Sequence, residues 1–276
     1  MRILYGVHGY SRGHATRAAA VLSELVREHE VLILAGPDAR DLLSERFDVV
    51  PIPSLRFEYG PEGRISPRTT LRKNGRLIGD MLVHGPVSRR LARKVKAFRP
   101  DVAISDAEPW THRVAARLRI PRVSFDHFGI MVYCDVPFAP GDRLASAFDR
   151  LAYRVLMGRP ERVLVSSFYE APARSREVKI IGPLLGEEVR AIDVPRREHI
   201  LVYLNNGEHQ LTPRLRAELE RSDLPLVVYG AGRVGQEGKL DFRAPSRRGF
   251  LEDLASARAV VSTAGNQLVG EALYFG

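Results

Sequence analysis

The sequence is poor in cysteine and has no long apolar run. Cys134 is the one cysteine among 276 residues. This excludes an internal disulfide framework and a cysteine-rich metal site, and it favours a reducing, cytoplasmic compartment. No apolar run approaches the roughly 20 residues that cross a bilayer. Tyr10, Ser11 and Arg12 are polar where an export signal would still be apolar, so the N-terminus predicts no signal peptide.

Positive charge is in surplus, with a formal net charge of +9. Much of it lies between Arg64 and Arg99, where one acid, Asp80, accompanies eleven basic residues. Such a block indicates an anionic partner, either a membrane surface, a phosphorylated lipid or a nucleic acid. A nucleic acid is disfavoured, because the block has few aromatic residues and no recognised module. A solvated face in an arginine-rich protein is the open alternative. The eleven are Arg64, Arg68, Arg72, Lys73, Arg76, Arg89, Arg90, Arg93, Lys94, Lys96 and Arg99.

Short apolar runs alternate with helical patterns along the chain, which predicts parallel sheets covered by helices. The segment 183–197 lacks periodicity, carries two prolines and is the best linker candidate. We therefore expect an α/β protein of two doubly wound domains, residues 1–183 and 184–276. The expected strands are 2–7, 30–35, 47–52, 101–105, 122–125, 162–166, 178–182, 199–204, 226–229, 240–242 and 258–262. The expected helices are 15–26, 37–46, 87–98, 112–118, 144–157, 213–222, 249–256 and 266–274.

A glycine-rich loop, GYSRGHAT, joins the first strand to the first helix. Gly9 and Gly13 permit tight turns and close ligand approach. The helix start offers free N–H groups and partial positive charge to an anion. His14, in the first helical turn at the carboxyl edge of the sheet, is suited to act as a general base. The alternative is a histidine that only hydrogen-bonds the loop.

Two further polar clusters follow strands. Asp106 and Glu108 come after the fourth strand, and Asp126 with His127 after the fifth. Because carboxyl ends of parallel strands share one edge, these groups are expected near His14. A carboxylate there is predicted to orient His14, to hold an acceptor hydroxyl, or to act as the base. Acidic residues are also common turn formers, so each alone is weak evidence.

Two other patterns carry less information. The run GAGRVG, residues 230–235, matches G-x-G-x-x-G, but QEGKLDF follows it and no apolar helix opens. We interpret it as a turn, which argues against a nicotinamide oxidoreductase. The amphipathic patterns at 87–98 and 144–157 fit either a membrane-surface helix or a core-facing surface helix.

The C-terminal run STAGNQLVGEALYFG gives a stronger signal. A strand ends at Ser262, a small-residue loop holds Gly265, and a helix carries Glu271. The loop N–H groups and the helix dipole suit a diphosphate. Glu271 is placed to accept hydrogen bonds from ribose hydroxyls.

The runs GVHGYSRGHATR and STAGNQLVGEALYFG together resemble GT-B glycosyltransferases, notably those that transfer N-acetylglucosamine to lipid-linked acceptors in peptidoglycan synthesis. SDAEPW and SFDHF are similar to strand ends of the same group. The resemblance implies two Rossmann-like domains, with the acceptor on the N-terminal one and the nucleotide sugar on the C-terminal one. It implies His14, Asp106 and Glu108 as catalytic candidates. The expected substrate-binding residues are Gly9, Gly13, Arg17, Asp126, His127, Asn206, Gly207, Thr263, Gly265, Asn266, Gln267 and Glu271.

By the same resemblance we expect a UDP-sugar donor, an inverting displacement, no metal and no cofactor. Residues 64–99 would fall on the acceptor side and touch an anionic lipid or the inner face of a membrane. The family's donor signature normally continues beyond the point where this sequence ends at Gly276. We therefore expect an incomplete second domain and weak or absent activity of this chain. A sugar-nucleotide epimerase of the same fold and a non-catalytic nucleotide-sugar or lipid-binding protein stay open as alternatives.

Overall fold

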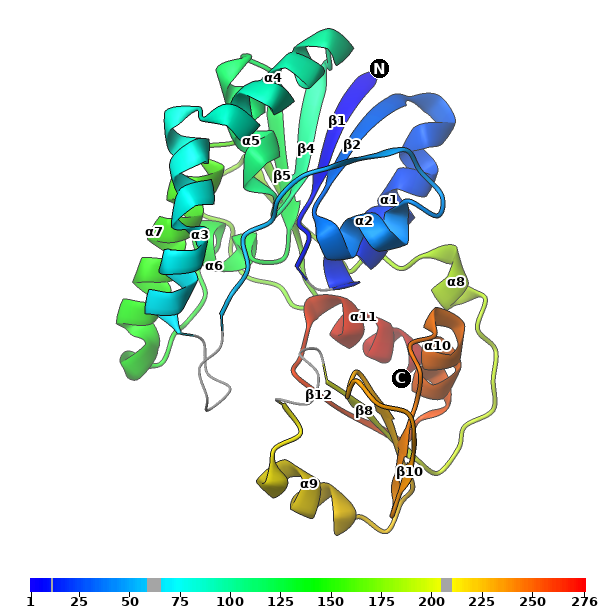
Figure 1. Cartoon of the computed structure of the whole chain (residues 1–276). Helices are drawn as coiled ribbons and strands as arrows, with labels where there is room; N and C mark the ends of the chain where they lie inside the picture. The colour runs from blue at the N-terminus through cyan, green and yellow to red at the C-terminus, as the bar shows by residue number, and fades with distance from the viewer. Residues whose placement is uncertain (11, 59–65, 205–209) are drawn as a thin grey trace. The chain divides into compact units, whose positions relative to one another are not determined.

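A computed structural model describes residues 1–10, 12–58, 66–204 and 210–276. The chain divides into two compact units, one ending at Leu184 and the other beginning at Leu185. We call them unit 1 and unit 2. Each holds one sheet with helices on both faces (Figure 1), so the predicted α/β class with two Rossmann-like sheets is confirmed.

Unit 1 contains a seven-stranded sheet in the order β3-β2-β1-β4-β5-β6-β7, and every pair in it is parallel. The order places β1, the first strand of the chain, in the middle and next to β4. The strands are β1 (Arg2–Val7), β2 (Glu30–Ala35), β3 (Val49–Pro51), β4 (Val102–Asp106), β5 (Arg122–Asp126), β6 (Arg162–Ser166) and β7 (Val178–Ile181).

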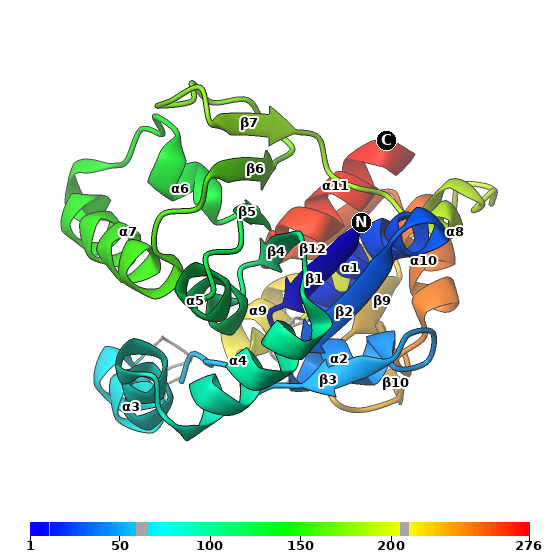
Figure 2. The same ribbon diagram turned by 90° about the horizontal axis from the view of Figure 1, so that it is seen from above.

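Helices cover both faces of this sheet, with α1 and α2 on one face and α3, α4, α5 and α7 on the other (Figure 2). The side-chain alternation of β1 matches these layers, because Leu4 packs in one apolar cluster and Tyr5 in the other. The helices are α1 (Arg12–Glu28), α2 (Pro37–Leu43), α3 (Pro67–Val83), α4 (Pro86–Phe98), α5 (Pro109–Arg117), α6 (Gly129–Tyr133), the 3-10 turn η1 (Pro140–Asp142) and α7 (Arg143–Met157).

Unit 2 contains a five-stranded sheet in the order β10-β11-β9-β8-β12, parallel except for the edge pair β10 and β11. Helix α9 packs on one face, and α10 and α11 pack on the other. The elements are α8 (Glu187–Arg190), β8 (Ile200–Tyr203), α9 (Pro213–Glu220), β9 (Leu226–Tyr229), β10 (Gly235–Glu237), β11 (Leu240–Phe242), α10 (Arg247–Ser256), β12 (Ala259–Ser262) and α11 (Asn266–Phe275).

Five elements were not expected from the sequence: α3, α6, the turn η1, α8 and β10. Helix α3 was not expected, although Ser66 caps it through the N–H of Thr69 and Pro67 occupies its first turn, which are ordinary helix-start signals. The predicted linker contains the short helix α8. As predicted, no helix opens after GAGRVG; residues Gly235–Glu237 instead form the edge strand β10, which was not expected. In the described part of the chain, no helix is long and apolar enough to span a membrane.

Candidate functional site

The carboxyl edge of the unit 1 sheet gathers the predicted polar residues. In the parallel register, Val7 at the end of β1 lies opposite Asp106 at the end of β4. The N–H of His8 donates to the carbonyl of Asp106 at 3.0 Å and extends this pairing by one residue. Asp126 ends the adjacent strand β5. The sheet therefore brings residues from three chain segments to one edge.

His14 and Asp106 are in direct contact. His14 Nδ1 lies 2.7 Å from Asp106 Oδ1, and 24% of the His14 side chain is exposed while Asp106 is fully buried. The carboxylate can only accept, so Nδ1 carries the proton and the lone pair of the neutral ring is on Nε2. Among the described residues, Nε2 has no hydrogen-bond partner. This is the geometry of an imidazole oriented by an acid, with one nitrogen left to accept a proton.

Arg17 holds the same carboxylate from one helical turn later. Its Nε donates to Asp106 Oδ2 at 2.9 Å, and its second terminal nitrogen donates to Oδ1. The Arg17 side chain is only 3% exposed. Burial alone would raise the pKa of Asp106, but the charges of Arg17 and His14 hold it below its ordinary value. Arg17 was predicted to bind substrate, whereas its guanidinium here faces Asp106.

His8 was not singled out from the sequence and lies beside His14. The two rings form an edge-to-face pair with centroids 5.3 Å apart. Burial, followed by the proximity of His14, lowers the pKa of His8 to about 3. His8 is therefore neutral at physiological pH and adds no positive charge beside His14. Its position directly after the first strand is the signal that would have identified it.

Glu108 does not belong to this group. Its Oε1 accepts from the N–H of Trp110 at 2.8 Å, and its Oε2 accepts from the N–H and the hydroxyl of Thr111 at 2.7 and 2.6 Å. Glu108 is thus the N-cap of α5 and is 1% exposed. Burial raises its pKa to about 7. We leave it out of the proposed catalytic set, because both oxygens are already bonded within the helix start.

Asp126 and His127 have separate environments. Asp126 is buried and accepts from the Tyr153 hydroxyl at 2.5 Å and from the N–H of Gly129 at 2.7 Å. It fixes α6 and α7 against β5. His127 is half-buried and its Nδ1 lies 2.9 Å from the carbonyl of Ser166. Of the two, His127 is the one with a partly exposed ring beside the His14 edge.

The two predicted loop glycines also differ. A Cβ on Gly9 would lie 2.3 Å from the backbone of Gly36, so Gly9 allows two strand-to-helix turns to pack against each other. Its N–H donates to Ser54 Oγ at 3.1 Å. Gly9 therefore has a packing role. Gly13 lies in the first turn of α1, next to His14.

In unit 2, the predicted donor loop lies between β12 and α11. Thr263, Ala264 and Gly265 are exposed, and Ala264 adopts a left-handed conformation with φ of 53°. Gly265 is the N-cap of α11, and a Cβ placed on it would meet nothing within 4 Å. Asn266 begins the helix, and within the described residues its side-chain amide has no hydrogen-bond partner. The loop thus presents a helix start with open space beside it.

Glu271 sits on α11 and is held by Arg247 of α10. The terminal nitrogens of Arg247 lie 2.7 Å from Oε1 and 3.2 Å from Oε2 of Glu271, and Gln267 Nε2 donates to Oε1 at 3.0 Å. The Glu271 side chain is 2% exposed and that of Arg247 is 33% exposed. Arg247 also approaches Glu188 at 3.3 Å. Gln267, predicted as a substrate contact, here positions Glu271.

Asn206 and Gly207, also predicted to bind substrate, lie outside the described residues, as does Arg64 of the basic block.

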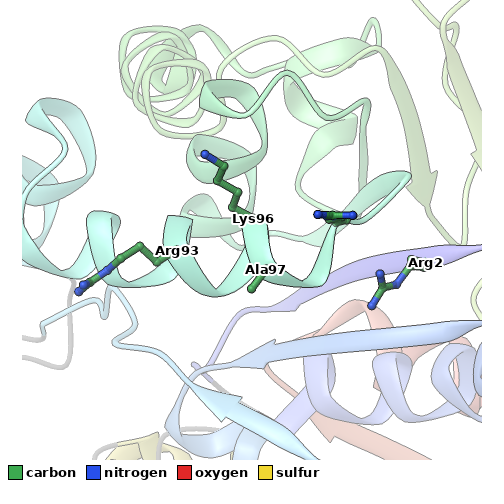
Figure 3. Close-up of a pocket in the computed structure, with 5 residues that line it drawn as sticks. Arg2, Arg93, Lys96 and Ala97 are labelled. Carbon is green, nitrogen blue, oxygen red and sulfur yellow. The ribbon is translucent and has the colours of Figure 1, made fainter.

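The rest of the basic block lies on α3 and α4, with Arg99 as the C-cap of α4. A hollow of about 650 Å³ is lined by Arg2, Arg93, Lys96, Ala97 and Arg99 (Figure 3). Arg93, Lys96 and Arg99 form no ion pair with any acid in the described ranges. A second hollow shares Arg93 and Lys96. Arg2 begins β1, so the first hollow lies at the amino edge of the sheet, opposite the edge that holds His14.

Comparison with known proteins identifies the chain. The profile of glycosyl transferase family 1 matches residues 1–276. A search of curated proteins gave no significant match. Similar solved structures include the glycotransferase of kitacinnamycin (TM-score 0.63, 19% identity, 99% of this chain and 78% of that one). UGT89C1 of Arabidopsis thaliana, solved with UDP, has a TM-score of 0.62 and 17% identity over the same shares. MurG of Acinetobacter baumannii has a TM-score of 0.54 and 15% identity over 100% and 76%.

These neighbours are glycosyltransferases of the GT-B fold, and at such identities they show the fold alone. The predicted resemblance is confirmed by the family match over the whole chain. The chain therefore belongs to glycosyl transferase family 1 and is a glycosyltransferase.

Proposed function

We propose that the chain transfers a sugar from a UDP-sugar to an acceptor hydroxyl, with His14 as the general base. The observation that carries this proposal is the 2.7 Å contact between His14 Nδ1 and the buried Asp106. It leaves Nε2 to take the proton of the acceptor as the new glycosidic bond forms. Asp106 stabilises the imidazolium that results, as a buried carboxylate does for a catalytic histidine. Attack by such an activated hydroxyl on the anomeric carbon corresponds to an inverting displacement.

Unit 2 is proposed to bind the donor. The N–H groups at the start of α11, with Gly265 and Asn266, suit the diphosphate, since four N–H groups of a helix start lack intrahelical partners. Thr263 is exposed on the same loop. Glu271 is the proposed acceptor of ribose hydroxyl hydrogen bonds, held in place by Arg247 and Gln267. UDP bound to UGT89C1 supports this nucleotide class. Stabilisation of the leaving diphosphate by the helix start requires no metal.

On unit 1, His127 and Gly13 are the proposed acceptor contacts beside His14. His127 stacks on Phe168 with ring centroids 5.8 Å apart, which fixes its ring plane. Burial lowers the pKa of His127, so the ring is neutral. Its Nδ1–H donates to the Ser166 carbonyl, which leaves Nε2 to accept a hydrogen bond from a sugar or lipid hydroxyl.

The proposal includes an anionic membrane surface as a partner of α3 and α4, with the protein cytoplasmic and peripheral. Arg93, Lys96 and Arg99 carry charge that no acid in the described residues neutralises. Leu82 and Val83 at the end of α3 are exposed, with Val83 at 80%. Cations beside apolar side chains suit lipid phosphates and the adjacent acyl boundary. These cations lie at the amino edge, so they would orient the protein and not contact the reacting hydroxyl.

Product analysis with UDP-sugars separates this function from its alternatives. The chain is incubated with UDP-N-acetylglucosamine, UDP-glucose and UDP-galactose, with and without candidate hydroxyl acceptors, and released UDP and altered sugars are measured. A transferase releases UDP in proportion to acceptor. An epimerase converts the sugar without acceptor, and a binding protein gives a thermal shift with no product. If the Asp106→Asn variant released UDP at the rate of the parent chain, His14 held by Asp106 would not be the base.

A further inference from the structure

Arg17 has no role in the chemistry proposed above, yet it forms the most buried ion pair in the described part of unit 1. Its side chain is 3% exposed and Asp106 is fully buried. Burying a guanidinium is unfavourable unless it is paired and fully hydrogen-bonded. If this position served packing alone, an apolar side chain would fill it without the cost of a buried charge. The geometry of its contacts indicates what it does.

The guanidinium takes both oxygens of Asp106. One nitrogen binds Oδ2 at 2.9 Å and another binds Oδ1, the oxygen that also faces His14. This two-point contact fixes the plane of the carboxylate. The position of Oδ1, and with it the ring of His14, then depends on Arg17 as well as on β4.

The terminal nitrogen of Arg17 that binds Oδ1 of Asp106 also lies 3.2 Å from His14 Nδ1. Both are donors when Nδ1 carries its proton, so no bond forms between them. The fixed positive charge of Arg17 therefore lies at contact distance from the imidazole. It opposes a second proton on the ring, whereas Asp106 favours one.

The charged and titratable groups around this pair come from three strands and one helix. His8 and Tyr5 lie on or directly after β1, Asp106 ends β4, and Asp126 ends β5. Burial lowers the pKa of His8 and raises the pKa of Tyr5, so both stay neutral near pH 7. Asp126 is bonded to Tyr153 and Gly129. Among the described side chains, Arg17 is the fixed cation that contacts the His14–Asp106 pair, and Arg56 acts on the neighbouring His8.

We propose that Arg17 is a positioning residue that orients Asp106 and keeps His14 unprotonated, and that it does not bind substrate. Asp106 alone would make the pair take up a proton at higher pH, and a protonated His14 is no base. Arg17 neutralises part of the negative charge of Asp106, and its own positive charge repels a positive charge on the His14 ring. This inference rests on the proposed function only in taking His14 as the base.

The test uses nitrogen-15 NMR of the eight histidines, with His14 assigned by the loss of its signals in His14→Gln. Three substitutions are compared with the parent chain: Arg17→Gln, Arg17→Lys and Arg27→Gln. The last is a matched control, because Arg27 lies on the same helix, has a side chain that is 69% exposed, and pairs with Glu24 at the surface. The readout is the tautomer of His14 and the midpoint of its titration. This readout needs no turnover, so it remains valid if the proposed function fails.

The parent chain is expected to show His14 with its proton on Nδ1. Arg17→Gln is expected to raise the midpoint of the His14–Asp106 pair by about one pH unit or more, the order expected for loss of a neighbouring charge. Arg17→Lys retains the charge and is expected to keep the midpoint while mixing the tautomers. Arg27→Gln is expected to change neither. An unchanged midpoint and tautomer in folded Arg17→Gln would overturn the proposal.

Kinetics give a second readout if the chain turns over. Positioning predicts that Arg17→Gln lowers kcat, leaves the KM of donor and acceptor near the parent value, and moves the acid limb of the rate profile to higher pH. A raised KM with an unmoved acid limb would mean that Arg17 binds substrate directly. Where Arg17→Gln does not fold, Arg17→Lys carries the test, and parent-like tautomer and kcat in it would contradict two-point positioning.

Discussion

Two arginine–carboxylate pairs occupy the two units, and they differ mainly in how far water reaches them. In unit 1, Arg17 and Asp106 are 3% and 0% exposed, and His14 shares the carboxylate. In unit 2, Glu271 is 2% exposed, but Arg247 is 33% exposed and also approaches Glu188. Electrostatic interactions weaken steeply with access to water. The first pair is therefore expected to control both folding and proton transfer, and the second to position one ligand contact.

The largest expected difference between the pairs is in stability. Arg17→Met leaves Asp106 buried with His14 as its remaining partner, and should lower the free energy of unfolding by about 3 to 5 kcal/mol. Arg247→Met should cost about 1 kcal/mol or less, because Arg247 is partly exposed, which weakens the ion pair, and Gln267 remains bonded to Glu271. Urea unfolding followed by fluorescence of Trp110, the one tryptophan, reports unit 1. Hydrogen exchange of α10 and α11 reports unit 2.

If Arg17→Met and Arg247→Met lowered the free energy of unfolding equally, the difference in burial would not explain the behaviour of the two pairs. The double variant Arg17→Met/Asp106→Asn is the control. It should recover much of the lost stability, because no uncompensated charge is then buried.

A third buried carboxylate, Glu108, extends the comparison, because it has no arginine partner among the described residues. Burial raises its pKa to about 7. Between its ordinary pKa and pH 7 the folded chain keeps a proton that the unfolded chain has lost, so stability should fall as pH rises through this window, by up to about 3 kcal/mol. Glu108→Gln should remove that slope. Asp106, with a lowered pKa, should act in the opposite sense and only at lower pH, where stability is lost as pH falls.

Trp110 fluorescence during urea unfolding at pH 5 and pH 8 measures the Glu108 effect. A parent chain that is no more stable at pH 5 than at pH 8, after subtraction of the Glu108→Gln values, would contradict the protonated state of Glu108.

In ligand binding the order of the two pairs should reverse. Glu271→Gln should weaken UDP binding by about tenfold, or about 1.4 kcal/mol, through loss of charge-assisted bonds to ribose. Asp106→Asn should leave UDP affinity unchanged, because the proposed donor contacts lie on unit 2. Calorimetric titration with UDP measures both. If UDP affinity fell in Asp106→Asn and not in Glu271→Gln, the donor would bind at the unit 1 site, and the proposed donor site on unit 2 would be wrong.

The smallest expected effect concerns the first hollow, which Arg93 and Lys96 of α4 line. Arg93→Gln and Lys96→Gln should each weaken binding to vesicles containing phosphatidylglycerol by about 1 kcal/mol, because each removes one cation from the surface. Arg248→Gln on α10, an exposed arginine paired with Glu252, is the control. Sedimentation with neutral phosphatidylcholine vesicles should show no dependence on any of the three. Equal binding to both vesicle types would refute an anionic membrane partner.

Much of the unit 1 edge could be predicted from the sequence. Alternation of strands and helices placed the ends of β1, β4 and β5 together, so His14 and Asp106 were expected near one another. The role of Glu108 could not be predicted, because it depends on α5 beginning at Pro109, three residues before the expected start. The partner of Arg17 is 89 residues away in the chain, and no local pattern encodes such a pair.

In unit 2 the donor loop and α11 were recognised from one contiguous run, whereas Arg247 was not, since its contact with Glu271 spans two helices. Helix α3 was missed because Gly75 and Gly79, residues of low helix propensity, interrupt its interior, although its cap was readable. Local signals therefore located loops and ends, and tertiary pairing decided which side chains were left free.

The central claim is that His14 is the base of a glycosyl transfer. The most direct measurement is acceptor-dependent UDP release by the parent chain and by His14→Gln, with UDP affinity measured on the same samples. His14→Gln is expected to lower the rate by about a hundred- to ten-thousand-fold, the usual contribution of a general base, and to leave UDP affinity unchanged. A parent-like rate in a folded His14→Gln chain would contradict it.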